Sequence, residues 1–191
     1  MSLSELYLAI YCRPLSEILT AMFCLCILWT VLRFAFMLRP GSARVWMWIN
    51  RVLCVCSVAG VLLVTVLSRD SAGGGVSFDL FRLPTEPGPR DEYPRMLLMN
   101  AFLFVPLGMS LGSSWPRTMP VFRCILYTAL GGLAVTLTCE LLQLITGLGT
   151  PEADDLVMNL AGVLLGMTHL PFSYGVRYLI ARAAKRGVPA S

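Results

Sequence analysis

The sequence predicts an all-α protein that is a polytopic membrane helical bundle with about five transmembrane helices. Of its 191 residues, 57% are hydrophobic and 14% are charged, whereas charged residues make up about 25% of soluble proteins. Apolar runs recur from near the start to about residue 181, which leaves no polar stretch long enough for a separate soluble catalytic domain. These observations exclude a soluble globular enzyme.

Five apolar segments qualify as membrane spans. The third contains 16 residues and reaches only about 24 Å, so it needs flanking residues or a locally thinner bilayer. The fifth is expected to break at Pro171. It therefore either continues as a kinked span, or Val176–Arg186 lies on the membrane as an interfacial helix. The five segments are Leu15–Leu38, Val45–Leu67, Met96–Leu111, Phe122–Leu148, and Leu156 to about Ile180.

The distribution of charge predicts an outside N-terminus and a cytoplasmic C-terminus. Ten Arg and Lys residues flank the first and third connections and form the tail, where the sequence has no Asp or Glu. The other side has five Arg residues against ten acidic residues, so Glu140 is the one acid left inside a span. We expect a multi-pass protein of the cell membrane whose partners are membrane lipids, with no nucleic acid among them.

Three regions follow from this pattern. Residues 1–67 form a two-span segment with a basic cytoplasmic loop, residues 68–181 form a membrane domain that carries the polar motifs, and residues 182–191 form a basic cytoplasmic tail. The connection Ser68–Arg95 is rich in Gly and Pro and is expected to fold back over the bundle as a loop.

The seven cysteines predict no metal and no cofactor. Nearly all lie inside or beside apolar runs, where cysteine behaves as a small hydrophobic residue. Cys54 and Cys56 lack the two-residue gap of a thioredoxin-like pair, and no pair is accompanied by the other ligands of a zinc site.

Polar residues within the last three spans are the candidate functional positions, because a charge in the bilayer costs about 3 kcal/mol or more. Each of these spans has polar residues and glycines along one helical face. The predicted topology brings the polar ends together in the outer half of the membrane, while the glycines, in two GxxxG motifs, allow close backbone packing. The three faces contain Asn100, Phe104, Gly108 and Gly112; Thr136, Glu140, Gln143 and Gly147; and Asp155, Asn159, Gly162 and Gly166. The ligand-binding candidates are Asn100, Glu140, Gln143, Asp154, Asp155 and Asn159.

Two interpretations of this polar layer stay open. In one, the helices open outward around a polar intramembrane pocket that binds a ligand. In the other, the layer is a self-satisfied network, with Glu140 protonated or paired to an arginine and the amides joining helices. Three carboxylates and three amides in one layer exceed what packing needs, which favours the pocket.

Three segments resemble the successive signatures of the VanZ-like family: residues 100–108 (NAFLFVPLG), 140–143 (ELLQ) and 154–162 (DDLVMNLAG). Their order and spacing match over about residues 68–170. The family's usual basic residue between the last two signatures is absent, and Arg82 matches an outer-loop segment only loosely. The resemblance implies a bacterial integral membrane protein of the cell envelope, linked through the family's namesake to glycopeptide resistance, especially to teicoplanin. It implies no mechanism.

Three hypotheses for mechanism follow. The first is binding of an envelope lipid, a lipid-linked envelope precursor or a lipoglycopeptide, which suits teicoplanin because that glycopeptide carries an acyl chain. The alternative is a membrane enzyme that acts on a lipid-linked substrate through Glu140, Asp154 and Asp155, which either hold a divalent cation or supply a general acid or base. The third is a scaffold without chemistry, for which a homo-oligomer or a partner protein supplies what is missing.

Overall fold

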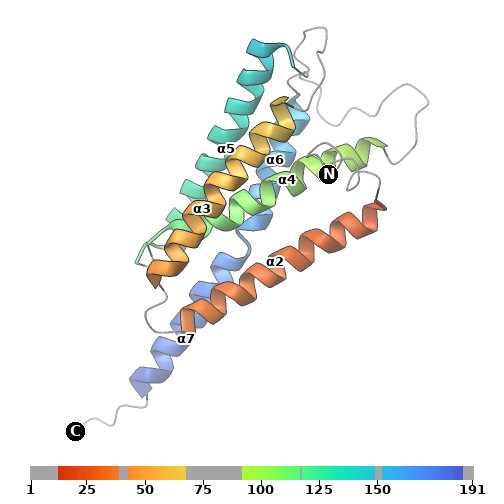
Figure 1. Cartoon of the computed structure of the whole chain (residues 1–191). Helices are drawn as coiled ribbons and strands as arrows, with labels where there is room; N and C mark the ends of the chain where they lie inside the picture. The colour runs from red at the N-terminus through yellow and green to blue at the C-terminus, as the bar shows by residue number, and fades with distance from the viewer. Residues whose placement is uncertain (1–12, 39–42, 68–91, 117, 149–151, 187–191) are drawn as a thin grey trace.

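The computed structural model describes residues 13–38, 43–67, 92–116, 118–148 and 152–186. Every element of these segments is helical, and five helical segments are long and apolar enough to cross a membrane. The predicted all-α class and the five predicted spans are therefore confirmed. The elements are α2 (Leu15–Leu38), α3 (Ala43–Leu62) with the π-helical turn η1 (Leu63–Leu67), α4 (Glu92–Ser114), α5 (Val121–Thr146), α6 (Ala153–Gly166) and α7 (His169–Arg186), as Figure 1 shows.

The third span is longer than its hydropathy predicted. Helix α4 has 23 residues and is about 34 Å long at 1.5 Å per residue, so it crosses a membrane without local thinning. The apolar run begins only at Met96, but the helix already begins at Glu92. Pro94 lies in the first turn, where a missing backbone N–H breaks no hydrogen bond within the helix.

The last span breaks before Pro171 and not at it. Helix α6 ends at Gly166 and α7 begins at His169. The proline ring clashes with the carbonyl group four residues earlier, which belongs to Met167, the residue at the break. Helix α7 then continues through Val176 to Arg186, so no separate helix begins at Val176.

Helix α4 lies at the centre of the bundle and packs against α2, α3, α5 and α6. In an 18-residue apolar window of its span, 61% of the residues are buried, against 22% in the corresponding windows of α2, α3 and α5. The outer helices instead expose large apolar side chains such as Phe23, Val55, Phe122 and Ile145, as expected for surfaces that face lipid.

Helices α4 and α6 run parallel at backbone contact. A Cβ atom on Gly162 would collide with the carbonyl oxygen of Ala101, and one on Gly166 would collide with that of Val105. Gly108 of α4 meets the backbone of Val163 in the same way. The packing role predicted for the GxxxG glycines is therefore confirmed at these three positions.

The two ends of the bundle differ in charge. We call the end where α2, α4 and α6 begin the acidic end, because all the described carboxylates lie there or, for Glu140, in the adjoining turns of α5. The opposite end, where α3 and α5 begin, we call the basic end (Figure 1). The side of the membrane on which each end lies stays a prediction.

Candidate functional site

The first turn of α6 is fixed to α4 by both of its aspartates. Asp154 accepts a hydrogen bond from the hydroxyl group of Tyr93, and Asp155 accepts one from Nδ2 of Asn100. Asn100 and the two aspartates are buried. A carboxylate in the first turn also interacts favourably with the positive end of the helix dipole. The structure therefore brings three of the six candidates, Asn100, Asp154 and Asp155, to one α4–α6 contact.

Glu140 joins α5 to the start of α6. Its Oε2 accepts a hydrogen bond of 3.2 Å from the backbone N–H of Glu152, the residue immediately before α6. Glu140 is half-buried, whereas the other five candidates are buried. It is thus the member of the set that is most accessible from the surface.

Gln143 connects α5 to the first half of the chain. It is 1% exposed, and its Nε2 donates a hydrogen bond of 2.8 Å to the carbonyl oxygen of Thr65 in η1. Carbonyl groups in the last turn of a helix have no partner within that helix. The Gln143 amide supplies a donor to one of them.

Three buried oxygens of α5 and α6 lack a hydrogen-bond partner within the described part of the chain: Thr136 Oγ1, Gln143 Oε1 and Asn159 Oδ1. We call these three atoms the unpaired layer. Gly132 packs against Val163 across the antiparallel α5–α6 contact. Thr136 and Asn159 each lie four residues, about one turn, from that contact toward the acidic end, so they come level with each other.

Thr136 differs from the other threonines of α5. The hydroxyl groups of Thr128, Thr138 and Thr146 donate to the carbonyl four residues earlier, at 2.7, 2.8 and 2.7 Å. The Thr136 hydroxyl makes no such bond although its side chain is fully buried. Its position is therefore not explained by the usual hydrogen bond of a helical threonine.

The unpaired layer has a definite chemical preference. The amide oxygens of Gln143 and Asn159 can only accept hydrogen bonds, and the Thr136 hydroxyl can donate or accept. A buried polar atom without a partner costs about 1–3 kcal/mol. A group that brings N–H or O–H donors, such as an amine, a hydroxyl or a water molecule, would recover that free energy.

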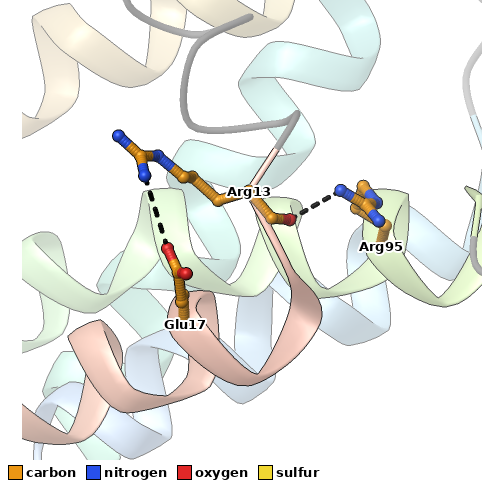
Figure 2. A network of polar contacts seen from close by, with 3 residues as sticks. All are labelled: Arg13, Glu17 and Arg95. Carbon is orange, nitrogen blue, oxygen red and sulfur yellow. Dashed lines mark hydrogen bonds and ion pairs between the residues drawn. The ribbon is translucent and has the colours of Figure 1, made fainter.

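Arg95 ties α4 to α2 at the rim of the acidic end. Figure 2 shows its Nη1 donating a hydrogen bond of 2.6 Å to the carbonyl oxygen of Arg13, just before α2. Arg13 also forms an ion pair of 3.6 Å with Glu17. Arg82, the residue that matches an outer-loop segment of the family loosely, lies outside the described residues, as does most of the predicted outer loop.

The described residues contain no group of three or more His, Cys, Asp or Glu placed to hold a metal ion. Asp154 and Asp155 lie against α4, whereas Glu140 meets the backbone before α6. The divalent-cation version of the enzyme hypothesis therefore has no geometric support in this part of the chain.

Sequence reasoning missed two members of the site, Tyr93 and Thr65. Tyr93 lies seven residues before Asn100, a spacing that places both on one helical face, and this signal could have found it. Thr65 takes part through its backbone carbonyl, which no residue pattern identifies.

The fold and this polar layer define a multi-pass membrane protein with hydrogen-bonding groups buried inside its helical bundle. The family model VanZ/LLP1 matches residues 22–174. The chain therefore belongs to the VanZ/LLP1 family, which confirms the resemblance of the three motifs. The match begins within α2, well before residue 68, where the motif resemblance started. The comparison with curated proteins and that with solved structures gave no match.

Proposed function

We propose that the protein acts in the bacterial cell membrane by binding the polar part of a lipid or lipid-anchored ligand at the acidic end of its bundle. The binding groups are those of Asn100, Glu140, Gln143, Asp154, Asp155 and Asn159. By the charge distribution, this end faces outward. A lipoglycopeptide such as teicoplanin is the ligand class that the family name suggests, and binding it would contribute to glycopeptide resistance.

The observation that carries the proposal is the unpaired layer. Packing alone gives no reason to bury Thr136 Oγ1, Gln143 Oε1 and Asn159 Oδ1 without partners, because apolar side chains of similar shape avoid the cost. A ligand with hydroxyl or amine donors supplies the missing partners. An acyl chain beside those donors would remain in the bilayer next to the exposed apolar side chains of α5, such as Leu141 and Leu144.

Glu140 has a second role, which is to make the first contact with an approaching ligand. Its half-buried carboxylate lies one turn from both Thr136 and Gln143 on α5, so it is the first member of the site that an approaching ligand meets. A carboxylate at that place favours a ligand that carries a positive charge or several hydrogen-bond donors.

Thermal unfolding of the purified protein in nanodiscs tests this function. We expect teicoplanin to raise the melting temperature of the wild type, and vancomycin, which serves as the glycopeptide without an acyl chain, to raise it less. Asn159→Leu and Glu140→Gln should lose most of the response to teicoplanin. The control variant Thr138→Val changes an exposed threonine of the same helix and should respond like the wild type. Equal responses of all four proteins would contradict the proposal.

The alternative function is an enzyme that acts on a lipid-linked envelope substrate through Glu140, Asp154 and Asp155. It predicts chemical conversion of the bound molecule, whereas binding alone predicts that the molecule is recovered intact. Mass spectrometry of lipids incubated with the protein separates the two functions. Size-exclusion chromatography with light scattering tests the homo-oligomer that stays a prediction.

A further inference from the structure

A cavity lies at the basic end, opposite the site proposed above. It has a volume of about 460 Å³ and is lined by residues of α2, α3, α4 and α7 and by two residues that follow α4. This volume falls within the range of about 300–1,000 Å³ that is typical of small-molecule sites. Three arginines from three different helices line it: Arg33, Arg51 and Arg177.

Arg33 is the buried member of this group. It is 9% exposed although it lies within a membrane-spanning helix, where a charged side chain is costly. Its Nε donates a hydrogen bond of 3.1 Å to Oγ of Ser173, and this hydroxyl donates in turn to the carbonyl oxygen of His169 at 2.8 Å. The guanidinium group is therefore held in a fixed orientation at the wall of the cavity.

Aromatic rings hold the other two guanidinium groups. Arg51 lies over the ring of Trp48 at 5.2 Å, and Arg177 lies over the ring of Tyr174 at 5.7 Å. Both distances are within the range of cation–π contacts. The hydrogen bond of Arg33 and these two ring contacts favour particular positions of the three charges before a ligand arrives, which lowers the entropy cost of binding.

No Asp or Glu is among the described residues that line the cavity. In the sequence, the stretches 18–69, 93–139 and 156–191 contain no acidic residue, and they supply all the residues of its wall. Two lining residues also form hydrogen bonds with the surrounding helices: Ser113 Oγ accepts one from Trp29 Nε1 at 3.2 Å, and Trp115 Nε1 donates one to Thr128 Oγ1 at 2.8 Å. The charged side chains among the described lining residues are therefore all arginines.

We propose that this cavity binds a phosphate group, carried either by an anionic lipid headgroup or by a soluble phosphoester. Guanidinium groups match the oxygens of phosphate in bidentate geometry. The site is the chemical opposite of the acidic end, where the unpaired layer requires donors from its ligand.

The test is native mass spectrometry of the delipidated full-length protein with four probes: phosphatidylglycerol, a glucosyl diacylglycerol without phosphate, glycerol phosphate and inorganic phosphate. We expect phosphatidylglycerol or glycerol phosphate to bind at least about tenfold more tightly than the glucosyl lipid, which corresponds to about 1.4 kcal/mol. Binding by the lipid alone identifies a headgroup site. Displacement of that lipid by glycerol phosphate or inorganic phosphate identifies a site for soluble phosphoesters.

Three variants attribute the binding to the cavity. Arg51→Gln and the double variant Arg51→Gln/Arg177→Gln should each weaken binding of the phosphate-bearing probe, the double variant by about tenfold or more. Arg123→Gln removes the same charge from an exposed position on α5 that does not line the cavity, and it should bind like the wild type. Arg51 is exposed, so its replacement leaves the fold intact. Equal binding by Arg123→Gln and the double variant, or equal binding of the glucosyl lipid, would overturn the proposal.

Discussion

Asn100 donates a hydrogen bond to Asp155 across the same α4–α6 contact at which Gly162 meets the backbone of Ala101. A buried polar bond and a glycine contact therefore lie side by side at one helix pair. Helix α5 packs on this pair through Gly132 and Val163. Two of the unpaired oxygens, those of Thr136 and Gln143, lie on α5, and the third, that of Asn159, lies on α6. The closely packed α4–α6 pair therefore supports a site whose hydrogen-bond donors would come from a ligand.

The bond between Asn100 and Asp155 should contribute measurably to stability. A double-mutant cycle with Asn100→Ala and Asp155→Ala is expected to give a coupling energy of about 1–3 kcal/mol, because hydrogen bonds to charged groups are the strong ones. Unfolding in mixed micelles with increasing SDS measures it. The exposed Arg13–Glu17 pair is the control and should give less than about 1 kcal/mol. Equal coupling energies in the two cycles would show that the buried hydrogen bond contributes no more to stability than the exposed ion pair does.

Gly162→Ala should destabilise the protein strongly, whereas Gly175→Ala should not. The added methyl group at position 162 collides with the backbone of Ala101, while at position 175 it meets nothing within 4 Å. Overpacking costs about 1–3 kcal/mol, and a backbone neighbour cannot move aside as a flexible side chain does. The same SDS titration measures both variants. A neutral Gly162→Ala would mean that α4 and α6 do not touch in the membrane.

In the absence of ligand, Thr136→Val should leave the free energy of unfolding unchanged or raise it by as much as about 3 kcal/mol. The reason is that it removes a buried hydroxyl group that has no partner. Thr138→Val, at an exposed threonine bonded to the carbonyl of Ala134 at 2.8 Å, should change stability by less than about 0.5 kcal/mol. Thermal unfolding of both variants without ligand checks this. Clear destabilisation by Thr136→Val would show that its hydroxyl is satisfied, and the unpaired layer would lose one member.

The basic end should lie in the cytoplasm, since Arg and Lys are concentrated on the cytoplasmic side of membrane proteins. A green fluorescent protein fused after Ser191 should fluoresce, and alkaline phosphatase fused at the same place should be inactive. Active phosphatase would place the C-terminus outside the cell. The acidic end and its polar site would then face the cytoplasm. The phosphate cavity would then face the exterior.

Hydropathy alone located all five spans, because each contains an 18-residue stretch that is strongly apolar and has no more than two charged residues. Helical spacing also identified the glycines that bring α4 and α6 together. Hydropathy placed the start of the third span at Met96, because the polar first turn of α4 gives no apolar signal, and that turn supplies flanking residues that the short span was expected to need. It also expected the break of the last span at Pro171, whereas the steric conflict of a proline falls on the preceding turn.

The candidate site could be predicted only in part. The spacing of Asn100, Glu140 and Asp155 selected residues that the structure places at one end of the bundle. Spacing does not reveal which partner a polar group chooses, so the bond from Gln143 to η1 and the unsatisfied Thr136 hydroxyl required coordinates. The basic-end cavity was missed for the same reason. Its arginines come from helices that are distant in sequence, and each alone reads as an ordinary flanking charge.

The most direct test of the central claim is antibiotic susceptibility of a Gram-positive host that expresses the wild type, Glu140→Gln, Asp155→Asn or the control Thr138→Val at matched membrane levels. Teicoplanin and vancomycin are tested side by side. If the polar layer binds a lipid-anchored glycopeptide, the wild type and Thr138→Val raise the inhibitory concentration of teicoplanin, while Glu140→Gln and Asp155→Asn do not. Equal susceptibility of all four strains, or equal protection by all four proteins, would contradict a role of this layer in glycopeptide resistance.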